Sequence, residues 1–264
     1  MELNLNKLME KYIIKSRIYL TKKQNLKLYY GYCKRSNKDV FIKQFNIEKE
    51  KNKLFCEKTL NFYKLIPDNL DFILYPEEIF YDKNFCFVIY PYYKYDLYEF
   101  INKVPLNNGE KITIIKNISK GIEKLQEYQI AHLDLKLENI LIDQNLNIKI
   151  IDYDTYHKLY EKNCKLTSVV GTRTVNAPEI SKLEYNEKSD IWSIGIILLN
   201  MVTFRDLPIN AQSTNLIQKY INKTIKDEEI RKILNNILII EPENRINIKK
   251  LNNLFIKNVY NNVY

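Results

Sequence analysis

The run His132-Leu133-Asp134-Leu135-Lys136-Leu137-Glu138-Asn139 places a carboxylate, an ammonium group and an amide within one short stretch. Further along, Asp152-Tyr153-Asp154 adds carboxylates directly after a short apolar run. This set of groups suits Mg²⁺-assisted transfer of a phosphoryl group. That reaction needs in-line positioning and cancellation of the charge on the phosphate oxygens more than covalent help. Taken alone, an Asp–Lys–Asn trio on a loop is more often a solvated turn than a site.

Four other segments carry residues that fit the same chemistry. Each has an ordinary explanation by itself, because a lysine that ends a strand is usually on the surface and a lone tryptophan is usually in the core. Their order along the chain is much harder to explain by chance. The segments are Val40-Phe41-Ile42-Lys43, the stretch from Gly171 to Glu179 that ends in Ala-Pro-Glu, Asp190-Ile191-Trp192-Ser193-Ile194-Gly195, and Glu241-Pro242-Glu243-Asn244-Arg245.

The elements that must position these residues differ between the two parts of the chain. Short apolar runs separated by polar turns predict strands around one helix in the first third. From Leu97 onward, apolar spacings of three and four predict helices. This layout is typical of an α+β fold. The expected strands are 17–20, 26–33, 40–45, 72–74, 85–90, 140–142 and 148–151. The expected helices are 48–65, one long helix with Ile112, Ile115, Ile118, Ile122 and Leu125 on one face, 189–202, 216–220, 227–239 and 248–255.

The ordered set resembles the eukaryotic-type Ser/Thr protein kinases, although it lacks their glycine-rich loop. The resemblance implies a bilobal kinase fold over residues 12–258, with a β-rich N-lobe at about 12–90 and a helical C-lobe at about 91–258. A short polar tail at 259–264 follows. It also implies ATP and Mg²⁺ as cofactors and a protein hydroxyl as the phosphate acceptor.

The same resemblance implies roles for the motif residues of the C-lobe. Asp134 would orient or accept the proton of the substrate hydroxyl, and Lys136 would neutralise the transferring phosphate. Asn139 and Asp152 would hold the metal ions. The structural residues would be Thr172, which bridges Asp134 and Lys136, Asp190, which anchors the catalytic loop, and the pair Glu179–Arg245.

For ATP binding, the resemblance implies that Lys43 contacts the α- and β-phosphates and pairs with Glu57, with Glu48 and Glu50 as rivals for that pairing. Ile89 would be the gatekeeper residue. The backbone of Tyr90 to Tyr92 would face adenine. The remaining expected ATP contacts are Leu28, Phe41, Asp96 as the ribose contact, and Leu141 as the floor of the adenine pocket.

Four departures from the family pattern bear on activity. The three glycine positions fall on Thr21, Lys23 and Leu26, so the backbone should close less well over phosphates. Phe41 replaces the usual alanine above adenine, and Asp154 replaces the glycine of the metal-binding triplet. Leu133 replaces the arginine that usually pairs with a phosphorylated residue, so phosphorylation of Thr167 or Ser168 is not expected to be the main switch.

Three functions remain open at this point. The first is an active Ser/Thr kinase, favoured because every charged group that phosphoryl transfer needs is present. The second is a pseudokinase that acts as a binding or scaffolding module. The third, a small-molecule kinase, is disfavoured by the segment from Gly171 to Glu179, which is typical of a peptide-binding shelf.

Amino-acid composition limits the classes of binding partner and the cellular locations that we expect. The net charge is +9, but lysines do not interleave with aromatics in a stripe, so nucleic acid is not expected. No apolar run is long enough for a membrane span. Four scattered cysteines indicate reduced thiols and an intracellular location, cytoplasmic or nuclear. We expect a monomer whose minimal length leaves control to a protein regulator or to expression.

Overall fold

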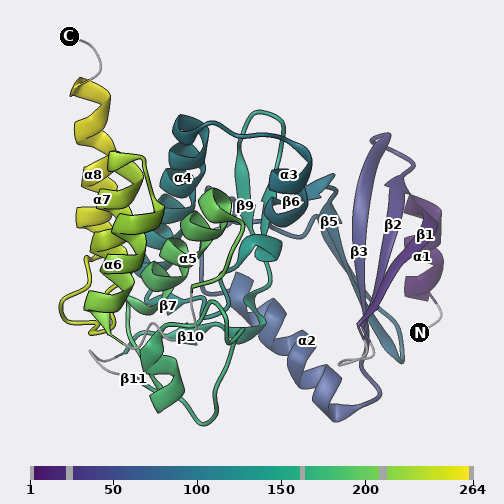
Figure 1. Ribbon diagram of the computed structural model, residues 1–264. Coiled ribbons are helices and arrows are strands. Elements are labelled where there is room, and N and C mark those ends of the chain that lie inside the picture. The colour runs from purple at the N-terminus through teal and green to yellow at the C-terminus, as the bar shows by residue number, and fades with distance from the viewer. Residues whose placement is uncertain (1–2, 22–25, 161–163, 208–212, 262–264) are drawn as a thin grey trace. The chain divides into compact units, whose positions relative to one another are not determined.

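A five-stranded antiparallel sheet with one helix near each face makes up the N-terminal part of the computed structural model (Figure 1). The structure describes residues 3–21, 26–160, 164–207 and 213–261. They divide into two compact units. The first unit comprises Met1–Asn69 and Leu74–Lys94, and the second comprises Leu70–Ile73 and Tyr95–Tyr264.

The sheet of the first unit has the strand order β1-β2-β3-β5-β4. All its neighbouring strands are antiparallel, as expected for strands joined by short turns. The β2–β3 turn uses Asn37 in the left-handed region, which asparagine tolerates. The elements are α1 (Leu3–Lys11), β1 (Tyr12–Thr21), β2 (Leu26–Cys33), β3 (Lys38–Asn46), α2 (Glu50–Tyr63), β4 (Glu78–Tyr81) and β5 (Phe85–Pro91).

Helix α1 was not expected from the sequence, and it covers one face of this sheet. Its Leu8 is fully buried, and Lys11 at its end forms an ion pair with Glu78 at 2.6 Å. A nine-residue helix has too few turns to give a clear periodic signal, and it depends on packing for stability. The core on this face consists of Leu8, Tyr12, Val40, Ile42, Phe80, Phe87 and Ile89.

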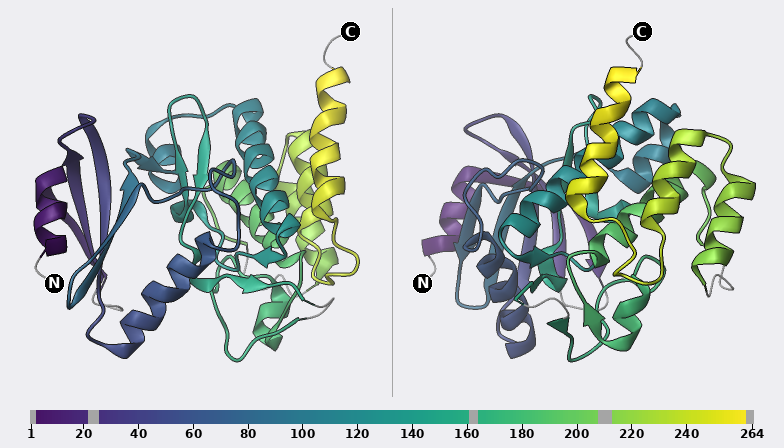
Figure 2. Two further views of the ribbon diagram at one scale, coloured as in Figure 1. Left: turned by 180° about the vertical axis from the view of Figure 1, so that it is seen from behind. Right: turned by 90° about the vertical axis from the view of Figure 1, so that its left-hand side faces the viewer.

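The second unit is mainly helical. Helix α4 packs against α5 and α8, and α7 packs against α5 and α6 (Figure 2). Most of the residues of α5 are buried, which explains its continuous apolar sequence. The helices are α3 (Leu97–Lys103), α4 (Asn108–Glu127), α5 (Ser189–Thr203), α6 (Thr214–Thr224), α7 (Glu228–Ile237) and α8 (Ile248–Asn261), with short 3-10 turns η1 (Leu137–Asn139), η2 (Tyr153–Thr155) and η3 (Pro178–Lys182).

Short strands connect these helices and carry the motif residues. They form a three-stranded sheet β6-β8-β9 and two two-stranded ladders, β7–β10 and β11–β12. Their bounds are β6 (Tyr95–Asp96), β7 (Ile130–Ala131), β8 (Ile140–Ile142), β9 (Ile148–Ile150), β10 (His157–Lys158), β11 (Cys164–Lys165) and β12 (Glu184–Tyr185).

The expected α+β class is confirmed, and most expected elements are present with shifted ends. The strand expected at 72–74 is only a single bridge between Ile73 and Ile150. Strand β4 was not expected. On α4, Ile115, Ile118, Ile122 and Leu125 are buried as predicted, whereas Ile112 is partly exposed and Ile114 is buried instead. Within the described ranges, no helix is both long and apolar enough to cross a bilayer.

Candidate active site

The stretch His132–Asn139, here called the catalytic loop, is held at its start by Asp190. The Asp190 carboxylate lies at the start of α5. Its two oxygens accept hydrogen bonds from the backbone N–H groups of His132 and Leu133, at 2.7 and 2.9 Å. Leu133 has φ = 61°, a left-handed conformation that costs a non-glycine residue roughly 1–2 kcal/mol. Burial raises the pKa of Asp190, although nearby His132 and the two N–H groups favour the charged form. The anchor therefore compensates for strain in the loop.

His132 orients the backbone beside Asp134, a role that was not expected from the sequence. Asp134 N–H donates to His132 Nδ1 at 3.2 Å, so the ring proton must lie on Nε2. His132 Nε2 then donates to the carbonyl oxygen of Ile151 at 2.9 Å. This tautomer ties the catalytic loop to the segment that leads into Asp152. The residue was part of the run that pointed to the site, so its type and place were the available signal.

Asp134, Lys136 and Thr172 form a closed set of polar contacts. The Thr172 hydroxyl donates to Asp134 Oδ1 at 2.7 Å and accepts from Lys136 Nζ at 2.9 Å. Lys136 Nζ also contacts Asp134 Oδ2 at 3.0 Å. The Asp134 carboxylate is about 11% exposed and the Lys136 side chain about 22%, so both are sheltered yet reachable. An anion and a cation are thus held side by side by a hydroxyl from a distant segment.

Asn139 extends this set toward the residues expected to bind metal. Its amide nitrogen donates to the Asp134 carbonyl oxygen at 2.8 Å and to Asp134 Oδ2 at 3.3 Å. The Ile151 N–H donates to the Asn139 carbonyl oxygen at 3.0 Å, which places Asp152 beside the same loop. Asp152 itself lies in the left-handed region, with φ = 68°. Carboxylate and amide oxygens are the ligands that Mg²⁺ prefers.

The residue after Asp152 is part of the core. Tyr153 is 1% exposed, its hydroxyl donates to the Ile150 carbonyl oxygen at 2.7 Å, and its ring lies 5.2 Å from that of His132. Asp154, the unusual end of the triplet, is partly exposed at the surface of the 3-10 turn η2. The carboxylate of Asp154 is therefore not buried by the substitution of glycine.

The stretch that carries Thr172 depends on a glycine. Gly171 has φ = 73°, and a Cβ built there would overlap the carbonyl oxygen of Leu133 and approach Asn176 Oδ1 within 2.7 Å. Glycine thus allows the segment to lie directly against the catalytic loop. The bridge from Thr172 to Asp134 follows from this close approach.

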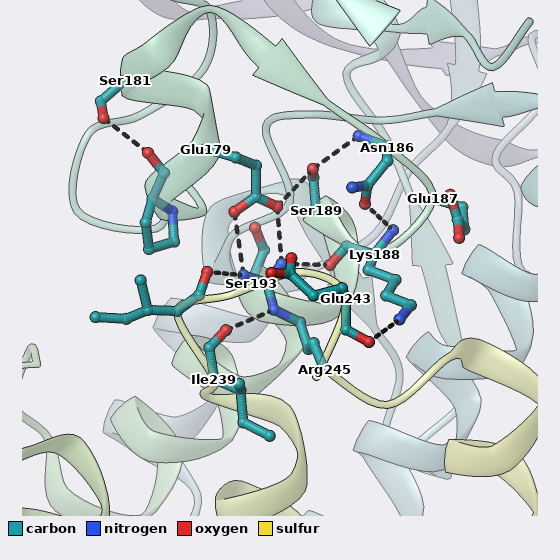
Figure 3. Close-up of polar contacts among 12 residues, drawn as sticks. Glu179, Ser181, Asn186, Glu187, Lys188, Ser189, Ser193, Ile239, Glu243 and Arg245 are labelled. Carbon is teal, nitrogen blue, oxygen red and sulfur yellow. Dashed lines mark hydrogen bonds and ion pairs between the residues drawn. The ribbon is translucent and has the colours of Figure 1, made fainter. Parts of the chain in front are cut away.

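A buried ion pair fixes the far end of the same segment (Figure 3). Arg245 contacts Glu179 with two nitrogens, at 2.8 and 3.1 Å, and both side chains are almost fully buried. The Ser189 hydroxyl donates to the Glu179 carboxylate at 2.9 Å. The guanidinium also lies 5.2 Å from the centre of the Trp192 ring. Its remaining hydrogen bonds go to the carbonyl oxygens of Lys188, Ile239 and Ile240.

Two expected nucleotide contacts belong to the second unit. Asp96 caps helix α3 by accepting from the Glu99 N–H at 2.7 Å, and its pKa is raised chiefly by burial and then by the charges of Glu99 and Glu138. Leu141 pairs with Asp96 across β8 and β6. Its neighbours Ile140 and Ile142 are buried, whereas Leu141 is partly exposed. Asp96 and Leu141 therefore lie side by side.

In the first unit, Leu28, Phe41 and Lys43 share one face of the sheet, because Leu28 pairs with Lys43 across β2 and β3. The Lys43 ammonium lies 5.4 and 5.7 Å from the ring centres of Phe45 and Phe55. Phe41 is partly buried. Of the expected glycine positions, Lys23 lies outside the described residues.

The expected pairing of Lys43 with Glu57 stays a prediction. Glu57 is exposed on α2. The buried positions of this helix are Asn52, Cys56, Thr59 and Phe62, so Glu57 points away from the packed side. The rivals Glu48 and Glu50 are exposed as well. The sequence of α2 does not show a clear enough apolar pattern to predict which side of the helix faces the core.

The expected gatekeeper is wrong by one residue. Phe41 pairs with Tyr90, and Ile42 pairs with Ile89, so Ile89 lies on the opposite face from Phe41 and Lys43. There it packs in the core beneath α1. The Tyr90 hydroxyl instead lies 3.4 Å from that of Tyr63 on α2. Because side chains alternate along a strand, a shift of one residue exchanges the two faces.

The expected adenine contacts at Tyr90 to Tyr92 shift for the same reason. Tyr90 is still inside strand β5. The Tyr92 N–H donates to the Asp39 carbonyl oxygen at 3.3 Å, so it is already engaged. Its ring packs edge-on against Tyr30, 5.0 Å away. Strand β5 thus ends at Pro91, inside the range that was expected to be the hinge.

Comparison with known proteins agrees with this geometry. A family model described as "Protein kinase domain" matches residues 27–256. The chain is 29% identical over 236 residues to serine/threonine-protein kinase STE20 of Saccharomyces cerevisiae, which is 85% of this chain and 25% of that protein. It is 34% identical over 156 residues to serine/threonine-protein kinase shk2 of Schizosaccharomyces pombe, which is 55% of this chain and 26% of that protein. The chain spans about a quarter of the length of these relatives. It belongs to the protein kinase domain family.

Proposed function

We propose that the chain transfers the γ-phosphate of ATP to a serine or threonine hydroxyl of a protein. The observation that carries this proposal is the set of contacts among Asp134, Lys136 and Thr172. A sheltered carboxylate beside an ammonium group is what transfer between two oxygens requires. The similarity to relatives named as serine/threonine-protein kinases supports the same class of acceptor.

In this proposal Asp134 orients the acceptor hydroxyl and takes its proton as the oxygen bonds to the γ-phosphorus. The bond from that phosphorus to the β-phosphate oxygen breaks, and ADP leaves. The carboxylate is held by Thr172 and Asn139 without rotating, so its position is set before substrate arrives. Lys136 places its positive charge where the transferring phosphoryl group gathers negative charge. The Thr172 hydroxyl contacts both members of the Lys136–Asp134 ion pair and so helps to fix their positions.

Protein kinases generally use ATP with Mg²⁺. The donor set here fits such an ion, because Asn139 uses its amide nitrogen toward Asp134 and so keeps its amide oxygen for other partners. Asn139 and Asp152 would hold the metal, and Lys43 would bind the α- and β-phosphates. When bound, Mg²⁺ neutralises phosphate charge. The expected nucleotide contacts Leu28, Phe41, Asp96 and Leu141 keep their proposed roles, while the backbone contact to adenine moves from Tyr90 to Pro91 and beyond.

The cellular location, the oligomeric state and the partners of the protein are also proposals. Cys33, Cys56, Cys86 and Cys164 are thiols that are not joined in disulfides, which supports an intracellular location, cytoplasmic or nuclear. We expect a monomer that acts on protein substrates and answers to a protein regulator. Size-exclusion chromatography with light scattering tests the monomer.

The acceptor class is tested by incubating the protein with γ-labelled ATP, MgCl₂ and a mixed protein substrate, followed by acid hydrolysis and separation of the phosphoamino acids. Label on phosphoserine or phosphothreonine is expected, and it should require Mg²⁺. The control variant is Asp68→Asn, which changes an exposed carboxylate in the first unit. This variant should transfer label as wild type does. Label confined to phosphotyrosine, or to a small hydroxyl compound with none on protein, would contradict the proposal.

A further inference from the structure

A short ladder holds the middle of the activation segment, which runs from Asp152 to Glu179. Strand β11 pairs with β12, so Cys164 lies opposite Tyr185 and Lys165 opposite Glu184. The Leu166 N–H continues the ladder to the Leu183 carbonyl oxygen at 2.8 Å. The Lys165 ammonium also pairs with the Glu184 carboxylate. The segment is thus closed back onto the residues that follow its own end.

Tyr185 joins this ladder to the start of the activation segment. Its side chain is about 5% exposed, and its hydroxyl donates to the Lys158 carbonyl oxygen at 2.7 Å. The Cys164 thiol approaches the same oxygen at 3.9 Å. The Tyr185 ring lies edge-on to His157 at 5.4 Å. Burial, and secondly the Cys164 thiol, raise the pKa of Tyr185, so the phenol remains a donor at neutral pH.

Strand β10, which receives this hydrogen bond, leads directly to the catalytic loop. Within the β7–β10 ladder His157 pairs with Ala131, the residue before His132. The Thr155 hydroxyl donates to the His132 carbonyl oxygen at 2.9 Å. Tyr185 is therefore connected to the catalytic loop through one strand pair.

On the catalytic loop, leucine replaces the family's phosphate-binding arginine. Leu133 stands there, and it is about 4% exposed with its backbone held by Asp190. Thr167 and Ser168, the hydroxyl residues next to the ladder, are exposed. The contacts described above hold Cys164, Lys165 and Leu166 of the segment without such a phosphate contact.

We propose that Tyr185 is a positioning residue whose hydrogen bond to Lys158 holds the activation segment ready for protein substrates without phosphorylation of Thr167 or Ser168. We call Lys158, Cys164, Lys165, Glu184 and Tyr185 the Tyr185 clamp. The proposal rests on the proposed kinase function for its consequence but not for its geometry. Its first test therefore does not depend on catalysis.

That test is limited trypsin digestion of the unphosphorylated protein in an Asp134→Asn background, in which self-phosphorylation is expected to be greatly slowed. Lys165, a member of the clamp, and Arg173, which follows it in the activation segment, are both exposed cleavage sites. Tyr185→Phe removes only the hydroxyl, and loss of one such hydrogen bond corresponds to about a five- to tenfold larger open population. Cleavage after both residues should accelerate by that factor, whereas the exposed Tyr98→Phe on α3 should change nothing.

The second test separates positioning from overall stability. In the active protein, Tyr185→Phe should raise KM for the protein substrate several-fold while KM for ATP and kcat stay within twofold. Thr167→Ala/Ser168→Ala should keep wild-type activity and wild-type cleavage rates. Glu184→Gln, which weakens the ladder by another route, should move cleavage in the same direction as Tyr185→Phe.

The outcomes are distinguishable. Faster cleavage of Tyr185→Phe with no phosphoryl transfer by any variant would support the clamp and count against the kinase function. Unchanged cleavage of Tyr185→Phe alongside normal transfer would overturn the clamp and leave the function standing. Loss of activity in Thr167→Ala/Ser168→Ala, with faster cleavage at Lys165, would also overturn it, because phosphate would then be holding the segment.

Discussion

The buried pair of Glu179 and Arg245 should be costly to break from either side. Glu179→Gln would leave a guanidinium without its counter-charge where the Arg245 side chain is 0% exposed. Arg245→Met would leave the Glu179 carboxylate buried with the Ser189 hydroxyl as its remaining donor. Removing one partner of such a pair typically costs about 3–5 kcal/mol, because the other charge stays buried.

Arg245→Met adds a further cost that Glu179→Gln does not. The guanidinium donates to the carbonyl oxygens of Lys188, Ile239 and Ile240, and these groups would lose their partner. We therefore expect Arg245→Met at the upper end of the range or above it. For a chain of this length, 3–5 kcal/mol lowers Tm by roughly 6–10 °C.

The double variant should cost much less than the sum of the two single variants. Glu179→Gln/Arg245→Met removes both charges, so no unpaired ion remains. Since the two residues touch, we expect a coupling energy of at least about 1–3 kcal/mol. A matched control is Lys124→Met, which breaks an ion pair of 2.9 Å whose side chains are 42% and 49% exposed. That change should cost less than about 1 kcal/mol.

Urea unfolding at 25 °C followed by tryptophan fluorescence is the assay. Trp192 is the single tryptophan of the chain, and Arg245 lies over its ring, so the signal comes from the site itself. Circular dichroism on the same samples shows whether the second unit unfolds together with the rest. A change below about 1 kcal/mol for Glu179→Gln, no larger than for Lys124→Met, would refute the reasoning from burial.

Three further predictions follow from the site. Gly171→Ala should lower phosphoryl transfer at least tenfold and lower Tm, since its Cβ would overlap the Leu133 carbonyl oxygen; wild-type kinetics would contradict this close approach. Thr172→Ala should lower kcat/KM for protein substrate at least tenfold, whereas Thr172→Ser, which keeps the hydroxyl, should stay within about threefold; equal losses would contradict the bridge to Asp134. The raised pKa of Asp96 means that its contribution to stability is complete below the ordinary carboxyl pKa of about 3.9 and declines as pH rises through the folded-state value. Asp96→Asn keeps a capping side chain that does not titrate. The unfolding free energy of the variant minus that of wild type should therefore increase from pH 4 to pH 7, and a constant difference would contradict the raised pKa.

The residues of the catalytic loop could be predicted because residue types suited to one reaction occur there at close spacing. Asp134, Lys136 and Asn139 lie within a few positions of each other, so any fold of that loop brings them close. Their distant partner Thr172 was within reach of sequence reasoning because Gly171 precedes it and the Ala-Pro-Glu triplet follows it. Charged groups that must meet constrain the sequence strongly.

Packing residues offered no comparable constraint. The resemblance implied Ile89 as the gatekeeper, but the strand register places Tyr90, not Ile89, on the face of Lys43. Nothing in the types of these two apolar residues distinguishes the faces. Glu57 was assigned by distance along a helix, and the burial pattern of α2 turns it outward. Sequence patterns locate an element more firmly than they fix its rotation or register.

Tyr185 had no sequence signal of its own. Its partner is a backbone carbonyl oxygen, and a carbonyl is present at every residue whatever its type. Helix α1 was not predicted for a related reason, because its burial against the sheet is what makes it stable. Both features arise from tertiary contacts that a single sequence does not display.

The central claim is that Asp134 and the groups around it transfer phosphate from ATP, and single-turnover transfer of labelled γ-phosphate tests it most directly. Wild type should label a protein substrate in a Mg²⁺-dependent reaction, and Asp134→Asn should be slower by about 10²–10⁴. Asp134→Asn should still show a rise in Tm with Mg·ATP equal to that of wild type. If wild type binds Mg·ATP but labels no protein, or if Asp134→Asn labels it as fast as wild type, the account is contradicted.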